Sequence, residues 1–224
     1  MTSLDWVSDG SVTVVLPCLD EAASLPGVLA RIPPGYTPLV VDNNSTDGTA
    51  TVARRHGARV VTEPKPGYGS AVHAGIVAAA TPIVAVLDAD GSLDPAELPP
   101  MVVELERGAD MVTGRRRPLK GVRWPWHARL GTAVVSWRLR IRHRLPVHDI
   151  APIRVARRDA LLKLGVVDRR SGYPVELLVR AAAAGWKVVE CDVGYGPRTG
   201  GKSKVSGSAR GSLVAALDFW RAIS

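Results

Sequence analysis

Two aspartates one residue apart follow an apolar run that is typical of a buried strand. The run and the acids read "AVLDADGS" over residues 85–92, so the carboxylates belong to Asp88 and Asp90. Paired carboxylates form an oxygen-rich site of the kind that Mg²⁺ or Mn²⁺ prefers. Two protein ligands leave such an ion open to a substrate diphosphate, and Gly91 lets the ligand approach the backbone closely. The alternative is that one acid caps a turn, as Asp94 is expected to cap a helix.

Polar, glycine-containing segments also follow the other apolar runs of the first half. Asp42 is placed to accept a hydrogen bond from a base or a ribose hydroxyl, or else to form an Asx-turn into the next helix. Lys65 lies in a loop that Gly67 and Gly69 make pliable, and it suits a phosphate or a base carbonyl, or else only solvent. Together these segments indicate a ligand site: 17–21, 42–49, 63–71 and 88–92.

The elements that must position these residues alternate regularly. Continuous β-branched runs predict strands buried on both faces of a parallel sheet, at 11–17, 38–42, 58–63 and 82–88. Helices are expected between them, at 24–32, 45–57 and 69–80, with Ser24 as an N-cap and Gly57 after a C-terminus. Ligands of such α/β sheets bind beyond the carboxyl ends of the strands.

The second half is less regular, and the whole chain is expected to form a single domain. Helices are predicted at 94–108, 126–142, 158–165, 174–185 and 211–222, and strands at 109–114, 150–157 and 186–195. We expect three parts within this domain: residues 12–114, which hold the polar segments at the strand ends, residues 115–208, and a C-terminal helix at 209–224.

The charge is concentrated in one segment. The chain of 224 residues has a net charge of +8, yet residues 111–148 hold ten Lys or Arg, three tryptophans and no acid. A basic amphipathic helix with tryptophans is typical of a membrane interface, so 115–144 is expected to contact anionic lipid, or else to pack on the sheet with solvated arginines. The sequence holds no signature of a nucleic-acid-binding module, and the acid pair would repel phosphates without a metal.

Targeting signals and disulfide patterns are not evident. The chain has no apolar run of the ~20 residues that a spanning helix needs, and its first residues do not resemble a signal peptide. Cys18 and Cys191 stand alone without metal-like spacing. We therefore expect a cytoplasmic protein, peripheral on the inner membrane face, that is able to form a homo-oligomer.

These motifs resemble those of family 2 glycosyltransferases of the GT-A fold, the group that includes dolichol-phosphate and polyprenyl-phosphate sugar synthases. The matching segments run from Val12 to Ser208: "VVLPCLDEAASL", "VVDNNSTDGT", "PKPGYGSAVHAGI", "DADGSLDP" and "GWKVVECDVGYGPRTGGKSKVSG". Asp20 stands where the family usually has Asn, and Asn43 and Asn44 replace its second Asp and Gly. The resemblance implies a metal-dependent, inverting transfer of a hexose from a UDP- or GDP-sugar to an acceptor, most naturally a polyprenyl phosphate.

The resemblance also implies roles for individual residues. Asp88 and Asp90 would hold the metal on the donor diphosphate, and Ser92 stands where some relatives place a third ligand. Arg116 matches an arginine that reaches phosphate. Arg198 and Lys204 match residues of a loop that closes over the phosphates. The donor nucleotide would lie against Pro17, Leu19, Glu21, Asp42, Asn44 and Lys65.

A hydroxyl acceptor would require a catalytic base, whereas a phosphomonoester is already an oxyanion at pH 7. Glu176 and Asp149 are the candidate bases, although Glu176 is also spaced to pair with Arg180. Four alternatives remain: transfer to a soluble small-molecule acceptor with retention, a nucleotidyltransferase, a non-catalytic relative and a basic nucleic-acid-binding module. A nucleotidyltransferase would carry a glycine- and arginine-rich loop after the first strand, which "PCLDEAAS" is not.

Overall fold

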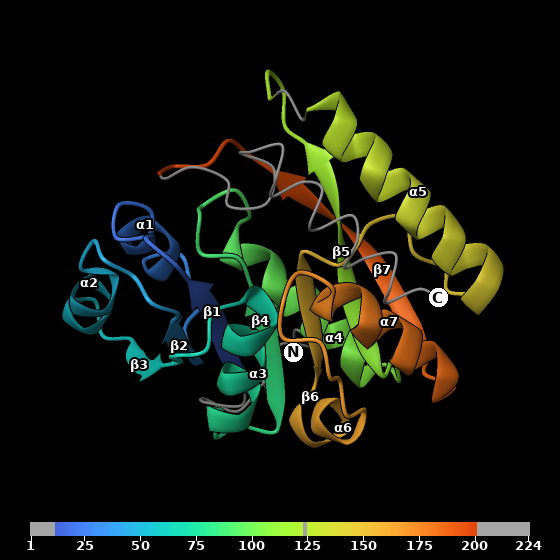
Figure 1. Cartoon of the computed structure of the whole chain (residues 1–224), viewed down its shortest axis with the longest axis horizontal. Helices are drawn as coiled ribbons and strands as arrows, with labels where there is room; N and C mark the ends of the chain where they lie inside the picture. Colours follow the sequence, from blue (N-terminus) through green and yellow to red (C-terminus); the bar gives the residue numbers. More distant parts are fainter. Residues whose placement is uncertain (1–11, 123–124, 201–224) are drawn as a thin grey trace, which may run out of the picture.

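Seven strands form one sheet with helices on both faces (Figure 1). The computed structural model describes residues 12–122 and 125–200, so the predicted helix at 209–224 lies outside the described residues. The strands are β1 (Val12–Cys18), β2 (Tyr36–Asp42), β3 (Arg59–Thr62), β4 (Ile83–Leu87), β5 (Met111–Pro118), β6 (Ile153–Arg157) and β7 (Val188–Tyr195). The helices are α1 (Leu25–Leu29), α2 (Thr49–Arg55), α3 (Tyr68–Ala78), the 3₁₀ turn η1 (Pro95–Glu97), α4 (Leu98–Glu106), α5 (Trp126–His143), α6 (Arg158–Lys163) and α7 (Tyr173–Ala183).

The sheet is mostly parallel, as predicted. Its order is β3-β2-β1-β4-β6-β5-β7, and β6 runs antiparallel to both of its neighbours, β4 and β5. The other described strands all run in one direction. The carboxyl ends of these strands and the amino end of β6 therefore meet at one edge of the sheet.

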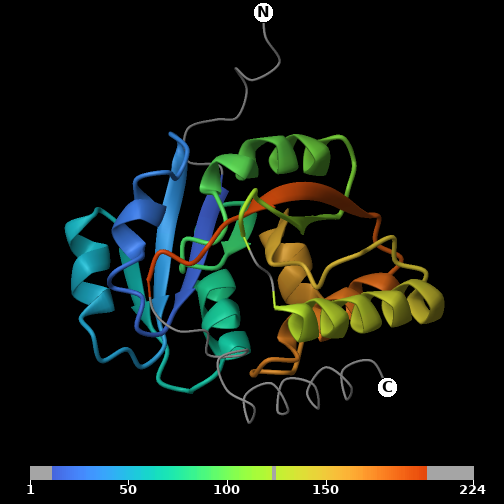
Figure 2. The same cartoon turned by 90° about the horizontal axis from the view of Figure 1, so that it is seen from above.

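Both faces of the sheet are buried, which explains the continuous apolar runs of the strands. In β1, Val12, Val14 and Leu16 pack in one core with α1, α2 and α4, whereas Val15 packs in the other with α3 and α7. Figure 2 shows α4 on one side of the sheet and α3 and α5 on the other. Two cores of this kind fix the strand ends, and so the loops that carry the polar residues.

Most predicted helix ends are confirmed. Gly57 follows the end of α2 with φ +79°, and Asp94 Oδ1 accepts a hydrogen bond from Ala96 N at the start of η1. Ser24 precedes α1 but does not cap it, because its hydroxyl donates to Glu21 Oε2 instead. The predicted helix at 45–57 begins only at Thr49, because residues 43–48 form a turn at the end of β2.

The segment 119–152 connects β5 to the antiparallel β6, so it starts and ends at the same edge of the sheet. It contains α5, which packs against α7 beside β5 and β7 (Figure 1). No helix among the described residues is both long enough and apolar enough to cross a bilayer.

Candidate active site

The acid pair, Asp88 and Asp90, follows β4 at the edge where the strand ends meet. Asp88 Oδ1 accepts a hydrogen bond from the Tyr68 hydroxyl at 3.2 Å, and Asp90 Oδ1 accepts one from Ser92 N at 2.8 Å. The Oδ2 atom of Asp90 pairs with Arg198 Nη2 at 2.9 Å. Each carboxylate is thus held through Oδ1, and Oδ2 is the atom left for an ion or a mobile side chain.

The carboxyl group of Asp88 ionises less readily than that of an ordinary aspartate. Burial and the nearby charge of Asp90 raise the pKa of Asp88, while Arg154, Arg116 and Arg198 act in the opposite direction. A cation bound at Asp88 would favour the ionised form of its carboxylate.

The residues present fit a hard divalent cation with open coordination positions. Carboxylate oxygens are the ligands that Mg²⁺ and Mn²⁺ prefer. No cluster of three or more His, Cys, Asp or Glu capable of holding a metal occurs in the described part of the chain. Two carboxylates make an incomplete site, and the remaining ligands would have to come from water or from a substrate.

Residues 196–200, which we call the closing loop, lie directly on the acid pair. Thr199 N donates to the carbonyl oxygen of Asp90 at 3.0 Å, and Gly196 N donates to that of Ser92 at 2.8 Å. Gly91 was expected to admit a ligand, but a Cβ there would lie 2.2 Å from Thr199 Oγ1, so the closing loop fills this space. Lys204, the second predicted cation of this region, lies outside the described residues.

The residues predicted to bind the nucleotide lie at the ends of β1 and β2. Pro17 is half-buried, Leu19 is exposed, and Glu21 is buried in the turn before α1. Asp42 Oδ1 accepts from Ser45 N at 3.1 Å, which is the turn that we considered as the alternative. This contact uses one carboxylate oxygen of Asp42 and leaves the other to a ligand.

A buried asparagine organises the loop that carries Lys65. Asn43 Nδ2 donates to the carbonyl oxygens of Glu63 and Lys65, and its Oδ1 accepts from Gly67 N. The neighbouring Asn44 has φ +68° and donates to the Pro64 carbonyl at 3.2 Å. The Lys65 side chain is exposed at this edge, as a residue that reaches a ligand would be.

Gly67 and Gly69 serve close packing, which differs from the pliability that we expected. A Cβ at Gly67 would lie 2.2 Å from the Arg169 carbonyl oxygen, and one at Gly69 would lie 2.8 Å from its carbonyl carbon. Gly69 N and Ser70 N also donate to the carbonyl oxygens of Arg170 and Arg169. The loop before α7 therefore locks the start of α3 in place.

Arg116 and Asp149 form a nearly buried ion pair. Arg116 Nε and Nη2 donate to the two carboxylate oxygens of Asp149 at 2.9 and 2.7 Å, and Arg116 N donates at 3.0 Å. Asp149 also accepts from Ile150 N at 2.7 Å. Burial alone would lower the pKa of Arg116, but the contacts with Asp149 raise it, so the guanidinium stays charged.

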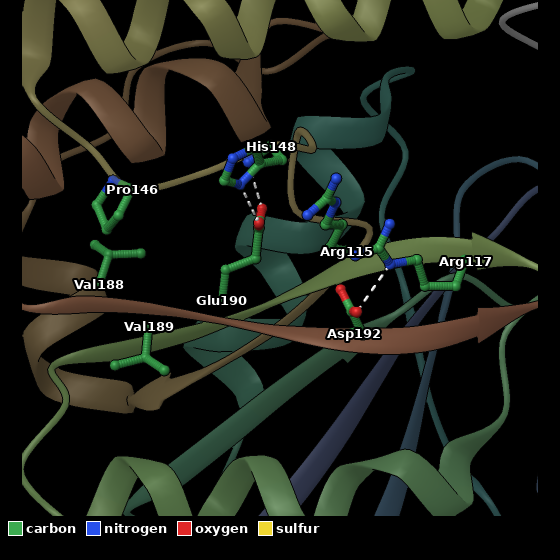
Figure 3. A pocket seen from close by; sticks show the side chains of 8 residues that line it. All are labelled: Arg115, Arg117, Pro146, His148, Val188, Val189, Glu190 and Asp192. Atoms are coloured by element: carbon green, nitrogen blue, oxygen red, sulfur yellow. Dashed lines mark hydrogen bonds and ion pairs between the residues drawn. The ribbon is translucent and has the colours of Figure 1, made fainter.

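Asp149 is itself held in place from β7. Glu190 Oε1 accepts hydrogen bonds from His148 N at 2.6 Å and Asp149 N at 3.1 Å, and its Oε2 pairs with His148 Nδ1 at 2.8 Å. Figure 3 shows the contacts of His148 with Glu190 and the pair of Arg117 and Asp192. These residues line a groove of about 570 Å³. The groove lies over β5 and β7, and the acid pair does not line it.

Glu176 lies in the first turn of α7 and pairs with Arg180, the partner that its spacing in the sequence indicated. Its carboxylate accepts from Arg180 Nε at 2.5 Å, from Val167 N at 3.0 Å and from Asp168 N at 2.6 Å. Burial would raise the pKa of Glu176, but these hydrogen bonds and the charge of Arg180 outweigh burial and lower it. Glu176 thereby fastens the loop before α7.

Replacing Glu176 by glutamine is expected to reduce the free energy of unfolding at pH 7 by about 1.5 to 3 kcal/mol, the range for hydrogen bonds to a charged group. The pKa of Glu176 in the folded protein lies below its ordinary value of 4.5. The stabilisation is therefore fully present above pH 4.5 and is lost as the pH falls through the folded-state pKa. Urea unfolding between pH 7 and pH 3 measures it. A difference between the two proteins that grows on acidification would contradict this assignment.

Two residues of the site, Arg154 and Tyr68, were not identified from the sequence. Arg154 on β6 is buried, and its Nη2 donates to the hydroxyl of Tyr68, which in turn donates to Asp88. The sequence did contain one indication that Arg154 has a role, because a charged residue in the middle of the apolar run "APIRVA" is unusual for a buried strand.

Comparisons with known proteins identify the family of this chain. The model of the family described as "Glycosyl transferase family 2" matches residues 13–164. The chain belongs to glycosyl transferase family 2. It is 77% identical over 214 residues to an uncharacterized glycosyltransferase of Mycobacterium tuberculosis, covering 96% of this chain and 98% of that protein.

Other relatives are more distant. The glycosyltransferase is 32% identical over 227 residues to an undecaprenyl-phosphate mannosyltransferase of Micrococcus luteus, covering 93% of each. Its fold resembles glucosyl-3-phosphoglycerate synthase of M. tuberculosis, solved with Mn²⁺, uridine diphosphate and glucosyl-3-phosphoglycerate. That match has a TM-score of 0.74 at 21% identity and covers 95% of this chain and 80% of the other. It supports the GT-A fold of the enzyme.

Proposed function

We propose that this enzyme moves a hexose from a UDP- or GDP-sugar to the phosphate of a polyprenyl phosphate at a membrane surface, with inversion. Residues 12–114 would bind the donor and residues 115–208 the acceptor. Support comes from the acid pair at the strand ends, from the arginines around it, and from the relative named as an undecaprenyl-phosphate mannosyltransferase.

The donor would lie across the ends of β1, β2 and β4. The base and ribose would contact Pro17, Leu19, Glu21, Asp42 and Asn44, and Lys65 would reach the nucleotide from the loop before α3. Mg²⁺ or Mn²⁺ bound to Asp88 and Asp90 would supply Lewis-acid neutralisation of the charge on the leaving diphosphate. The structural neighbour solved with Mn²⁺ and uridine diphosphate has the same fold.

The proposed phosphate acceptor rests on one observation, the hydrogen bonds that the two candidate bases already accept. Asp149 accepts four hydrogen bonds and Glu176 accepts three, so most of their acceptor positions are occupied by groups of the protein itself. Although burial raises the pKa of Glu176, its hydrogen bonds and the charge of Arg180 lower it, which makes Glu176 a weak base. A phosphomonoester acceptor needs no base, and Arg116 and Arg198 supply the positive charge that such an anion requires.

In the proposed step, an acceptor phosphate oxygen forms a bond to the anomeric carbon while the bond from that carbon to the nucleoside diphosphate breaks. The electron pair leaves with the diphosphate. Arg198, and Lys204 further along the chain, would stabilise this charge, which develops as the bond breaks in the transition state. Arg198 contacts Asp90 Oδ2 in the structure, and we expect it to exchange this contact for the diphosphate when the donor binds.

A row of exposed apolar side chains on α5 supports a membrane-bound acceptor. The apolar stripe consists of Trp126, Leu130, Val134, Trp137 and Ile141, which are 49% to 76% exposed. Their spacing of three and four residues places them on one side of the helix. Arg129, Arg142 and Arg144 are exposed beside them, and tryptophan and arginine together suit an anionic lipid interface.

Replacing Val134 by glutamate is expected to weaken binding to vesicles that contain anionic lipid by about tenfold, because a charge replaces buried apolar surface. Val77→Glu is the matched control, since Val77 is a valine on α3 with a similar exposed fraction, 51% against 49%. Vesicle sedimentation measures the bound fraction. Equal losses in the two variants, or none in Val134→Glu, would contradict docking through the apolar stripe.

The transfer assay tests the proposed function directly. The enzyme is incubated with Mn²⁺, a panel of labelled UDP- and GDP-sugars and a short-chain polyprenyl phosphate, with EDTA in a parallel reaction. We expect label on the lipid that is lost with EDTA, and an inverted anomeric configuration in the NMR spectrum of the product.

The acceptor is varied in two further arms. Polyprenol, which carries a hydroxyl in place of the phosphate, is expected to remain unlabelled because both candidate bases, Glu176 and Asp149, are engaged within the protein. A soluble phosphorylated acid such as 3-phosphoglycerate tests the reaction named for the structural neighbour. Label on that compound and none on lipid would overturn the polyprenyl-phosphate acceptor while retaining glycosyl transfer.

A further inference from the structure

Arg154 is a buried cation that forms no direct ion pair with a carboxylate among the described residues. It lies on β6 opposite Val86 of β4 and Thr113 of β5, and it is 2% exposed. Its Nε and Nη1 atoms have no hydrogen-bond partner, and no carboxylate in the described part of the chain pairs with it. Burying an unpaired guanidinium is costly, so a specific role must compensate for the cost.

Tyr68 is the contact that links Arg154 to the acid pair. Arg154 Nη2 donates to the Tyr68 hydroxyl at 2.5 Å, and the guanidinium carbon lies 5.7 Å from the centre of the Tyr68 ring. An arginine can only donate, so the phenol oxygen accepts and its single proton is directed to Asp88 Oδ1 at 3.2 Å. The donor and the acceptor of both hydrogen bonds are therefore fixed by the chemistry of these three side chains.

The backbone around Tyr68 keeps the phenol in place. Tyr68 is the first residue of α3, and the next residue, Gly69, packs against Arg169 and Tyr173 with no room for a Cβ. Gly67 is locked in the same way by Arg169. A rigid support of this kind can orient a metal-binding carboxylate, whereas a tyrosine on a mobile loop could not.

We propose that Arg154 and Tyr68 are positioning residues that hold Asp88 by Oδ1 and so direct Oδ2 to the divalent cation of the donor site. This inference rests on the proposed function, because it requires that Asp88 and Asp90 bind a metal. The buried charge of Arg154 polarises the Tyr68 hydroxyl and keeps its proton directed at the carboxylate. Neither residue touches the reacting atoms.

Mn²⁺ binding to Tyr68→Phe tests the proposal without any turnover. The electron paramagnetic resonance signal of free Mn²⁺ gives its Kd, with and without UDP or GDP. We expect the Kd of the variant to rise about 10- to 100-fold, as is usual when a residue that orients a metal ligand is removed. Tyr36→Phe is the control, because Tyr36 is a buried tyrosine whose hydroxyl has no hydrogen-bond partner.

A second variant separates positioning from mere packing. Arg154→Lys retains one cationic donor toward Tyr68, so its Mn²⁺ Kd should lie nearer to the wild-type value than that of Arg154→Met. Thermal unfolding of every variant reports packing independently. An unchanged Kd in folded Tyr68→Phe would overturn the inference, whereas a wild-type enzyme that binds no Mn²⁺ with either nucleotide would overturn the proposed function itself.

Discussion

Asp90→Asn is expected to reduce sugar transfer about 100- to 1,000-fold, the range seen when a group that stabilises transition-state charge is removed. The substitution keeps the size of the side chain and an oxygen for the hydrogen bond from Ser92 N. It removes the negative charge that would bind the metal and that pairs with Arg198. Initial rates of transfer at saturating donor, measured over a range of Mn²⁺ concentrations, give the size of the effect.

The control for Asp90→Asn is Asp94→Asn, which changes an aspartate only four residues away. Asp94 caps η1 and contacts Arg31 at 3.9 Å, so the change affects local stability and leaves the acid pair intact. We expect transfer by Asp94→Asn to stay within about twofold of wild type, since asparagine caps a helix about as well as aspartate. Comparable losses in the two variants would show that the effect at Asp90 is structural.

Asp149→Ala is expected to lower the free energy of unfolding by about 3 to 5 kcal/mol, because it leaves a nearly buried guanidinium without its partner. Arg116 and Asp149 have side chains that are only 17% and 2% exposed, so solvent cannot replace the lost contacts. The backbone N–H groups of Arg116 and Ile150 lose their acceptor as well. Urea unfolding at pH 7 measures the difference.

An exposed ion pair between β5 and β7 provides the comparison. Arg117 and Asp192 lie 2.8 Å apart with side chains 52% and 56% exposed, and Asp192→Ala should cost less than about 1 kcal/mol. If Asp149→Ala cost no more than Asp192→Ala and still abolished transfer, the role of Asp149 would be that of the base considered from the sequence.

The alternating strands and helices, and the meeting of polar loops at one edge, were predictable from the sequence. Valine- and isoleucine-rich runs such as β1 and β4 have no polar side, and a strand of this kind must be covered on both faces. The acid pair and Asp42 were identified because parallel strands bring their carboxyl ends together. This inference needs only the direction of the chain and the end of each run.

Contacts between segments far apart in the sequence were not predictable. Gly91, Gly67 and Gly69 are indistinguishable in the sequence from glycines that admit a ligand, yet Thr199 and Arg169 occupy the space beside them. Arg154 was assigned only to a strand, because its partner Tyr68 lies 86 residues earlier in the chain. The antiparallel direction of β6 was also not evident, because the residue pattern of a five-residue strand is the same in either direction.

The direction of β6 has a consequence for how such enzymes diversify. A connection between two parallel strands must return across the whole height of the sheet, which fixes a minimum length and a helix that fits the face. The connection from β5 to β6 starts and ends at the same edge of the sheet. Insertions and exchanges within this connection therefore do not disturb the register of any strand. The segment that carries α5 can therefore be exchanged while the ends of β1, β2 and β4 stay unchanged, and under the acceptor role proposed for residues 115–208 relatives with the same sheet would acquire different acceptors.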